Sequence, residues 1–307
     1  MRPSGIRLFN GHVLEFVAAS GALGDNGRGW WHERLICFIL WMFCLFLPKR
    51  LFDPALFDKF LKTVTFFPRA GNYRWWKPWD TLRFLPGFLN CTGVVNAYGL
   101  RNQGFFRALR QIFSRISPKR PMAVSIYPEN EEQLETMLHH LNYCANVVAV
   151  ELNVSCPNTG EKLGANARKI IRYCEIARNI SRHPLILKLS VAHCPALGTI
   201  IPAVMGKVAA IAINSVPWSI FSPEKPSPLA HHGGGGVSGM QAQCFTWAMA
   251  LDIQTQWPDM PVIWPSVWTK EDAIKLITEY HAPAISFASL FVRHPTEPTR
   301  IVRELLS

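Results

Sequence analysis

The stretch VVAVELNVSCPNTG (residues 147–160) begins as an apolar run and ends in a polar loop. Its first seven residues, rich in Val, predict a buried β-strand over Val147–Asn153. The polar residues Asn153, Ser155, Cys156 and Asn158 follow at the carboxyl end of that strand. A buried strand that runs into a polar loop is typical of α/β barrels, whose active sites lie at the carboxyl ends of the strands.

The same alternation extends from this stretch toward both ends of the chain. Short β-branched runs predict seven more strands, at Val13–Ala19, Leu61–Thr65, Met122–Ile126, Leu185–Leu189, Ala209–Asn214, Pro261–Trp264 and Ala284–Phe287. Amphipathic stretches predict helices at Glu131–Cys144, Asn166–Asn179, Ala196–Val208, Met240–Gln256, Lys270–Tyr280 and Pro298–Leu306. Eight strands with intervening helices predict an α/β fold, a (β/α)8 TIM barrel rather than an open doubly wound sheet.

Length and composition agree with a single barrel domain over residues 1–307. Apolar residues make up 49% of the 307 residues and charged ones 17%, which excludes a disordered or collagen-like chain. Residues 1–120 hold 18 basic and 6 acidic side chains with six of the eleven Trp, whereas residues 121–307 hold 14 and 15. This basic, aromatic part indicates either an anionic partner surface, lipid or nucleic acid, or a solubilising excess of charge.

The eight Cys form no C-x-x-C pair and have no His-rich neighbourhood at metal-ligand spacing. The spacing therefore argues against a zinc or iron–sulfur site, and we expect no metal. No secretory signal opens the chain, so we expect a reducing cytoplasm.

An uncharged run, LICFILWMFCLFL, covers Leu35–Leu47 inside a long insertion after the first strand, residues 30–60. Thirteen residues are too few to span a bilayer, which needs about 20. Flanking Trp30, Trp31, Arg34 and Lys49 resemble a membrane-interface anchor. The alternatives are a buried helix or an oligomer contact.

The other strand ends are also unusually polar. Lys62 lies in the second strand, Lys188 in the fifth, and Asn214 and Ser215 end the sixth. Packing alone does not explain two lysines, several amides and a thiol at one rim. This set of residues predicts an active site.

These polar positions fall in motifs that resemble the dihydroorotate dehydrogenase family over nearly the whole chain. The motifs are AASG (18–21), KTVT (62–65), PRAGN (68–72), NAYGLRNQGF (96–105), ELNVSCPNTG (151–160), LKLS (187–190), INSVPW (213–218) and GGVSG (235–239). The resemblance implies FMN-dependent oxidation of (S)-dihydroorotate to orotate in de novo pyrimidine biosynthesis. A base must then remove the C5 proton while a hydride leaves C6 for the flavin.

By this resemblance Cys156 is the catalytic base, and a cysteine at this position is similar to the soluble branch of the family. Lys188 would stabilise the reduced flavin. The substrate-binding residues implied are Lys62, Asn96, Tyr98, Gly99, Leu100, Asn153, Asn158, Asn214 and Ser215. The cofactor-binding residues implied are Ala19, Ser20, Lys62, Asn153, Lys188, Asn214, Gly236, Gly239, Ser266, Ala288 and Ser289.

The chain departs from the family pattern where the flavin phosphate normally rests. Pro265 and Ser266 stand in place of a Gly-Gly turn, and Ala288-Ser289 in place of a second glycine pair. Pro265 has no backbone N–H to donate. The hydroxyls of Ser266 and Ser289, with Arg293 nearby, are candidate replacements.

Two other functions fit parts of the sequence. One is a tRNA dihydrouridine reductase-like flavoenzyme, which the basic residues 1–120 would suit, although no separate RNA-binding domain remains and we expect no nucleic-acid partner. The other is a flavin-impaired barrel that acts as a membrane-associated scaffold. Fumarate, a quinone or a partner subunit remain open as electron acceptor. We expect a homo-oligomer, with peripheral contact to the inner face of the membrane through residues 35–47.

The run Leu35–Leu47 gives a first testable prediction. As a helix it would reach about 20 Å, short of the roughly 30 Å hydrocarbon core, so it can lie along the interface but not cross it. Burying its Leu, Ile, Phe and Trp side chains at about 1.5–3 kcal/mol each should give reversible binding that strengthens with anionic lipid. Liposome flotation measures this binding. A salt-insensitive dimer that never floats would instead support the oligomer contact.

Overall fold

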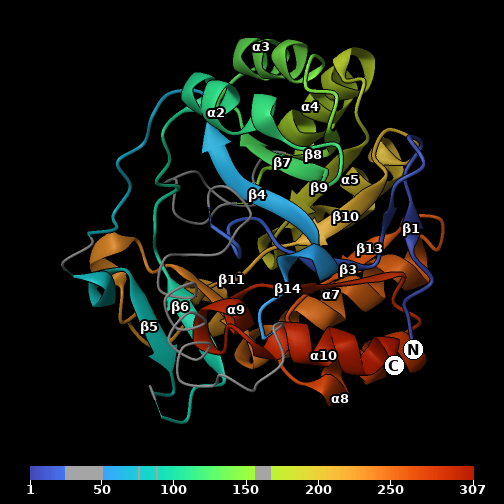
Figure 1. Cartoon of the computed structure of the whole chain (residues 1–307). Helices are drawn as coiled ribbons and strands as arrows, with labels where there is room; N and C mark the ends of the chain where they lie inside the picture. The colour runs from blue at the N-terminus through green and yellow to red at the C-terminus, as the bar shows by residue number, and fades with distance from the viewer. Residues whose placement is uncertain (25–50, 75–76, 88, 156–166) are drawn as a thin grey trace.

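The computed structural model describes residues 1–24, 51–74, 77–87, 89–155 and 167–307. Eight parallel strands close into a barrel in the order β10-β13-β14-β3-β4-β7-β8-β9 (Figure 1). Their bounds are Phe16–Ala18 (β3), Asp58–Thr65 (β4), Met122–Tyr127 (β7), Val147–Asn153 (β8), Leu185–Leu189 (β9), Ala210–Ile213 (β10), Val262–Trp264 (β13) and Ala284–Phe287 (β14). The closed barrel confirms the predicted (β/α)8 fold.

Helices connect the strands and cover the outside of the barrel (Figure 1). The α-helices of the described residues are α2 (Phe105–Gln111), α3 (Glu131–Leu141), α4 (Ala167–Ile180), α5 (Leu197–Val204), α6 (Trp218–Phe221), α7 (Gln243–Gln256), α8 (Lys270–Thr278), α9 (Ser289–Arg293) and α10 (Glu297–Leu306). Short 3-10 helices are η1 (Pro54–Leu56), η2 (Pro78–Asp80), η3 (Phe113–Arg115), η5 (Val191–Ala196), η6 (Ala230–His232) and η7 (Met240–Ala242).

Caps set where two of these helices begin. The Asn130 side chain accepts the backbone N–H of Gln133 at 2.9 Å before α3. Thr269 and Asp272 form a reciprocal capping box before α8. Such side chains satisfy backbone groups that the first helical turn leaves unpaired.

Several predicted segments differ in detail from the structure, and three of the differences bear on the barrel. The predicted strand Val13–Ala19 is divided, because β2 (Val13–Leu14) pairs antiparallel with β1 (Ile6–Arg7) and only β3 joins the barrel. The predicted helix Ala196–Val208 is the shorter α5, preceded by the 3-10 turn η5 that contains Pro195. The predicted insertion 30–60 overlaps the barrel, since β4 already begins at Asp58.

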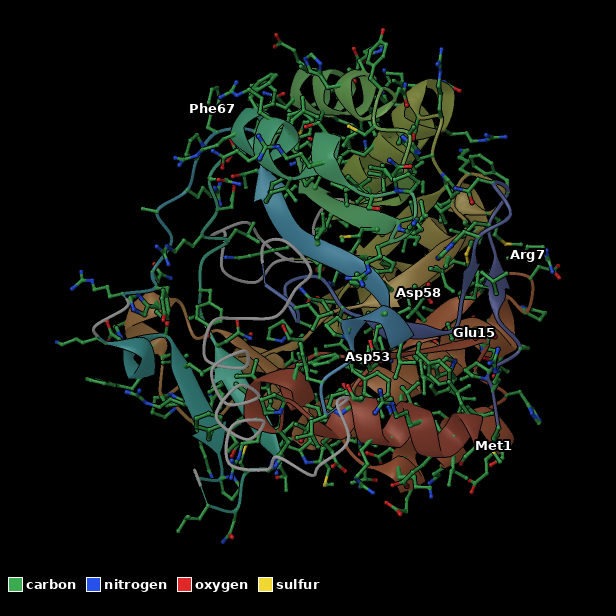
Figure 2. All side chains as sticks on the ribbon, viewed as in Figure 1. Met1, Arg7, Glu15, Asp53, Asp58 and Phe67 are labelled. Carbon is green, nitrogen blue, oxygen red and sulfur yellow. The ribbon has the colours of Figure 1, made fainter. Side chains whose placement is uncertain are left out.

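The β1–β2 hairpin closes the amino-terminal end of the barrel. Its Ile6, Leu8 and Leu14 are buried in one cluster with inward-facing residues of the strands, among them Phe60 and Ile186. Asp58 helps to hold the hairpin to β4, because its carboxylate accepts the backbone N–H of Glu15 at 2.9 Å and lies 2.8 Å from His12 Nε2. Figure 2 places Glu15 beside Asp58 at this end of β4 and Phe67 beyond the other end. The open end is therefore the carboxyl end.

A four-stranded antiparallel sheet lies to one side of the barrel (Figure 1) and was not predicted. Its order is β11-β12-β6-β5. Its bounds are Val216–Pro217 (β11), Gly236–Gly239 (β12), Gly93–Asn96 (β6) and Leu82–Leu85 (β5). A small separate core of Val95, Ala97, Leu229 and Val237 supports it.

Among the described residues, no helix is both long enough and apolar enough to cross a membrane. The run Leu35–Leu47 lies outside the described residues.

Candidate active site

A cavity of about 280 Å³ opens at the carboxyl ends of the barrel strands. Ala19 and Ser20 follow β3, Asn214 and Ser215 follow β10, and Ala288 follows β14, and all five line the cavity. Its size is close to the lower end of the range for small-molecule pockets, roughly 300–1,000 Å³. The pocket lies where TIM-barrel enzymes carry their active sites.

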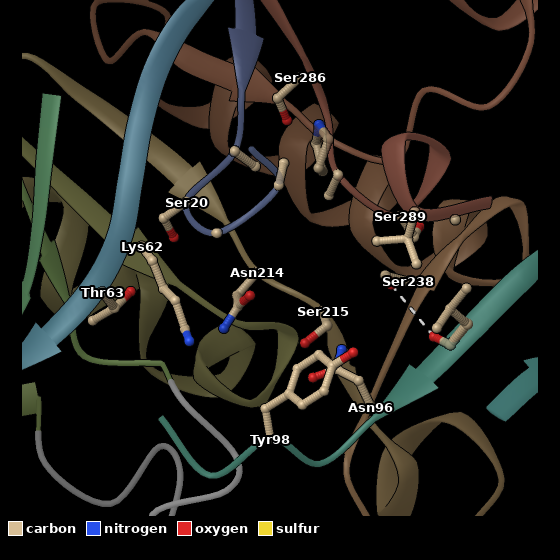
Figure 3. A pocket seen from close by; sticks show the side chains of 18 of the residues that line it. Ser20, Lys62, Thr63, Asn96, Tyr98, Asn214, Ser215, Ser238, Ser286 and Ser289 are labelled. Carbon is tan, nitrogen blue, oxygen red and sulfur yellow. Dashed lines mark hydrogen bonds between the residues drawn. The ribbon is translucent and has the colours of Figure 1, made fainter. Parts of the chain in front are cut away.

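An irregularity in β4 directs two neighbouring side chains into this pocket. The register between β4 and β7 shifts between Leu61 and Val64, as a β-bulge does. Strict alternation would send Lys62 and Thr63 to opposite faces, yet both line the cavity. Figure 3 shows the Lys62 amine and the Asn214 amide directed toward the same part of the pocket.

A buried ion pair lies at the base of the pocket. Lys188 Nζ is 3.5 Å from Glu151 Oε1, and their side chains are 6% and 2% exposed. Lys188 Nζ also donates to Ser20 Oγ at 2.6 Å. Glu151 Oε1 accepts a hydrogen bond from Ser125 Oγ at 2.6 Å. A cation this deep needs a compensating anion, which Glu151 supplies.

Hydrogen bonds connect this pair to the amides of the strand ends. Ser125 Oγ lies 2.8 Å from Thr63 Oγ1, which accepts an N–H of Asn153 at 3.0 Å. Asn153 Oδ1 accepts both the backbone N–H and the hydroxyl of Ser155, at 3.2 and 2.9 Å. Asn214 Nδ2 donates to the Ser155 carbonyl at 3.4 Å. The amides at the pocket are thus fixed in orientation before any ligand arrives.

The antiparallel sheet forms the facing wall of the pocket. Asn96, Tyr98 and Ser238 line the cavity from β6, the loop after it, and β12. Ser238 Oγ donates to the Val94 carbonyl at 3.3 Å, the dashed line in Figure 3. Burial raises the pKa of Tyr98 to about 12, with a smaller contribution from Tyr73, so the phenol is neutral near pH 7. This wall can therefore donate hydrogen bonds without adding charge.

The structure brings most of the predicted site residues into this one cavity. The lining includes Ala19, Ser20, Lys62, Asn96, Tyr98, Gly99, Leu100, Asn153, Lys188, Asn214, Ser215, Gly239, Ser266, Ala288 and Ser289. Gly236 is not in the lining; it is buried within the antiparallel sheet, where it pairs with Asn96 and Pro217. Cys156 and Asn158 lie outside the described residues.

Sequence reasoning missed several residues that belong to the site. Thr63, Tyr73, Arg101, Ser238 and Ser286 also line the cavity. Glu151 was missed although it stands in the quoted ELNVSCPNTG motif. The sequence did contain a signal for Glu151, because an acidic residue two positions before Asn153 faces the same side of the strand.

These features define a TIM-barrel enzyme with a charged, amide-rich pocket for a small polar ligand. A family model described as dihydroorotate dehydrogenase matches residues 60–306. The chain therefore belongs to the dihydroorotate dehydrogenase family, as its motifs predicted.

Individual relatives agree with this assignment. The chain is 30% identical over 224 residues to the catalytic subunit of dihydroorotate dehydrogenase B (NAD(+)) from Desulforudis audaxviator, covering 71% of this chain and 69% of that protein. It is 24% identical over 264 residues to dihydroorotate dehydrogenase A (fumarate) from Lactiplantibacillus plantarum, covering 82% and 81%. The ligand-free DHODH structure from Eimeria tenella superposes with a TM-score of 0.71 at 16% identity, covering 99% and 87%, and supports the fold.

The pocket residues fit a flavin, the cofactor type of this family. One end carries Ser20, Lys62 and Asn214, while Ser238 and Ser289 lie together at the other end (Figure 3). Ser266, which replaces a family glycine, has a φ of 65°, so the backbone keeps the left-handed conformation that glycine favours. Its hydroxyl lies 3.2 Å from Thr246 Oγ1. At Ser266 the chain therefore carries a side chain on a backbone conformation that favours glycine.

The buried pair of Glu151 and Lys188 yields a prediction about stability. Glu151→Gln keeps the shape but leaves Lys188 buried without an anion, which should lower the free energy of unfolding by about 3–5 kcal/mol. Adding Lys188→Met to that variant should restore part of the loss. Urea denaturation of the purified protein measures these differences.

The matched control is Glu175→Gln. Glu175 pairs with Lys207 at 3.1 Å, but the two side chains are 40% and 31% exposed, so this change should cost at most about 1 kcal/mol. Equal losses for Glu151→Gln and Glu175→Gln would contradict a special role for the buried pair.

Proposed function

We propose that this chain oxidises (S)-dihydroorotate to orotate in pyrimidine biosynthesis, with FMN as its flavin. Membership in the dihydroorotate dehydrogenase family supports the reaction. The observation that carries the assignment is one pocket that gathers Lys62, Lys188, Asn153 and Asn214 at the carboxyl end of the barrel. Family membership favours this function over a tRNA-modifying enzyme.

The hydrogen-bond donors and acceptors that the pocket amides can offer suit a flat ligand with alternating carbonyl and N–H groups. Counting bonds to the described residues, Asn153 uses Oδ1 for two bonds from Ser155 and one N–H for Thr63, so its second N–H can serve a ligand. On the same count Asn214 uses one N–H for the Ser155 carbonyl, which leaves Oδ1 and its second N–H. Asn96 offers a further amide from the opposite wall. Lys62 provides the cation for the substrate carboxylate.

Oxidation of dihydroorotate removes a proton from C5 and a hydride from C6, which leaves a C5=C6 double bond. The flavin, when bound, accepts the hydride. We assign the removal of the C5 proton to Cys156, which would act as the general base. Cys156 directly follows Ser155, which is fully buried and held by Asn153. The residue before the base is thus anchored to the same amide that can donate to the ligand.

Lys188 would lie beside the flavin ring and favour the negative charge that develops there on reduction. Glu151 opposes this effect, because its carboxylate lies 3.5 Å from the same amine. The flavin ring would then experience the electrostatic field of both groups, in which the Glu151 carboxylate partly cancels the positive charge of Lys188. Ser266 and Ser289 also line the pocket, and their hydroxyls would donate to the FMN phosphate, that of Ser266 after turning away from Thr246.

Three further properties stay predictions from the sequence: a homo-oligomer, a cytoplasmic location, and peripheral membrane contact through residues 35–47. The proposed reaction does not depend on any of them.

The role of Cys156 is tested by anaerobic flavin reduction. Dihydroorotate should bleach the flavin absorbance near about 450 nm in the wild-type protein. Cys156→Ala should keep the flavin but reduce it about 10²–10⁴-fold more slowly, because no base takes the C5 proton. Cys156→Ser should keep partial activity, since a hydroxyl can accept the proton less readily. Stopped-flow spectroscopy gives the rates.

Near-normal reduction of Cys156→Ala would remove Cys156 as the base without affecting the reaction itself. No bleaching of wild-type flavin by dihydroorotate would overturn the proposed function. Flavin released by heating and separated by chromatography distinguishes FMN from other flavins. Fumarate, NAD+ and a quinone, added in turn to the reduced protein, identify the acceptor.

The ion pair of Lys188 and Glu151 predicts opposite shifts of the flavin midpoint potential when one or the other residue is replaced. Lys188→Met removes the cation and should lower the midpoint potential, whereas Glu151→Gln removes the anion and should raise it. Shifts of about 30 mV or more are expected, equivalent to about 1.4 kcal/mol for two electrons. Equilibration with a reference dye measures the potential, and Lys207→Met, at a half-buried lysine outside the pocket lining, is the control. Shifts of the same sign in both variants would contradict the paired arrangement.

A further inference from the structure

Three metal-ligand side chains meet on the antiparallel-sheet side of the molecule, outside the pocket lining. Asp80 ends η2, two residues before the first residue of β5, and His231 and His232 end η6, directly before the glycine run that leads into β12. One ligand atom from each lies within 4.8 Å of the other two. Asp80 and His231 are 151 positions apart in the chain, so the fold creates this cluster.

Each histidine lies about as far from one carboxylate oxygen of Asp80 as two ligands of a small divalent cation lie from each other. His231 Nε2 is 3.0 Å from Asp80 Oδ1, and His232 Nε2 is 3.5 Å from Asp80 Oδ2. Zinc bonds of about 2.0–2.1 Å in a tetrahedron place neighbouring ligand atoms roughly 3.3 Å apart. The two measured separations lie on either side of that value.

Hydrogen bonding within the cluster is incomplete. The contact between His231 and Asp80 has the geometry of a hydrogen bond. His232 Nε2 is buried, and among the described residues it has no hydrogen-bond partner despite its nearness to Asp80. A buried ring nitrogen without a partner is costly, and coordination of a metal ion satisfies its lone pair.

The charges of the cluster also suit a cation. Asp80 contributes a carboxylate, a ligand of negative charge, beside the two imidazoles. Two imidazoles and one carboxylate form a common ligand set for zinc and related divalent ions, with a further position for water. The His231 side chain is 52% exposed, which leaves solvent access to the cluster.

We propose that Asp80, His231 and His232 bind one divalent transition-metal ion, with zinc the best match to the ligand set. This proposal departs from the expectation of no metal, which rested on ligand spacing along the chain, whereas these ligands come together only in the fold.

The ion would act as a clamp on the wall of the pocket. Asn96 is paired on one side with Leu82 of β5 and on the other with Gly236 of β12. Asp80 lies just before Leu82, and His232 just before the run of glycines 233–236. In that run Gly235 has a φ of 77°, and a Cβ there would lie 2.5 Å from the Asn96 carbonyl oxygen. An ion between Asp80 and His232 therefore ties together the two strands that flank Asn96.

The experiment uses the full chain, stripped of metal by a chelator and dialysed. Isothermal titration with Zn²⁺ should show one ion per chain, and Co²⁺ should give visible d–d absorption from an ordered site with nitrogen ligands. Asp80→Asn and His232→Ala should each weaken binding at least about 10- to 100-fold, the loss known for groups that only support ligands. Zn²⁺ should also raise the melting temperature of the wild-type protein.

The matched control is His139→Asn in α3. His139 and His140 are also adjacent histidines, but they do not belong to the Asp80 cluster. This variant should bind Zn²⁺ and Co²⁺ as the wild-type protein does.

Absence of stoichiometric binding to the wild-type protein would overturn the proposal, and this measurement does not depend on whether a variant folds. Binding unchanged in both Asp80→Asn and His232→Ala would also overturn it. So would a loss of stability in Asp80→Asn that is the same with and without metal, because the cluster would then be a hydrogen-bonded ion pair only. None of these results bears on the oxidation of dihydroorotate.

Discussion

The ion pair of Lys188 and Glu151 is the constraint on which the pocket depends. A lysine inside a barrel would be expelled or neutralised unless an anion lay beside it. Glu151 provides that anion on the neighbouring strand, and Ser20 and Ser125 satisfy remaining hydrogen bonds of the pair. Because the chain of hydrogen bonds continues through Thr63 to Asn153, one buried charge fixes the side chains at several strand ends. This buried ion pair and its hydrogen bonds hold the pocket side chains in place before a ligand binds.

This arrangement follows from the alternation of side chains along each strand. Inward positions near the amino-terminal end are apolar, such as Ala149 and Ile186, and pack on the β1–β2 hairpin. Two residues further along the same faces stand Glu151 and Lys188. The strands β8 and β9 therefore each contribute to a closed apolar floor and to a polar layer above it. The barrel can carry charges at one end because the other end supplies its hydrophobic core.

Much of the fold and site was predictable from the sequence because both follow local rules. Short β-branched runs identified the barrel strands, three of them with their observed bounds, and the polar residues in and after the strands located Lys62, Lys188 and Asn214. The antiparallel sheet escaped prediction, because short segments such as Val216–Pro217 and Gly236–Gly239 carry proline or glycine and show no strand pattern. The β4 bulge, which admits Thr63, depends on pairing with β7 and is invisible in one strand alone.

The antiparallel sheet matters for function because it supplies a side of the pocket that the barrel does not. The barrel alone supplies charges and amides from one side, but a flat ligand needs a second wall. Asn96 and Ser238 provide it from strands that join the barrel through loops rather than through the barrel's own hydrogen bonds. The position of that wall therefore rests on contacts within the sheet: its small core around Val95, the close approach of Gly235 to Asn96, and the cluster of Asp80 with two histidines. The contact of Asp80 in η2 with His231 in η6 links the segments that lead into β5 and β12, on the side of the pocket that the barrel leaves least constrained.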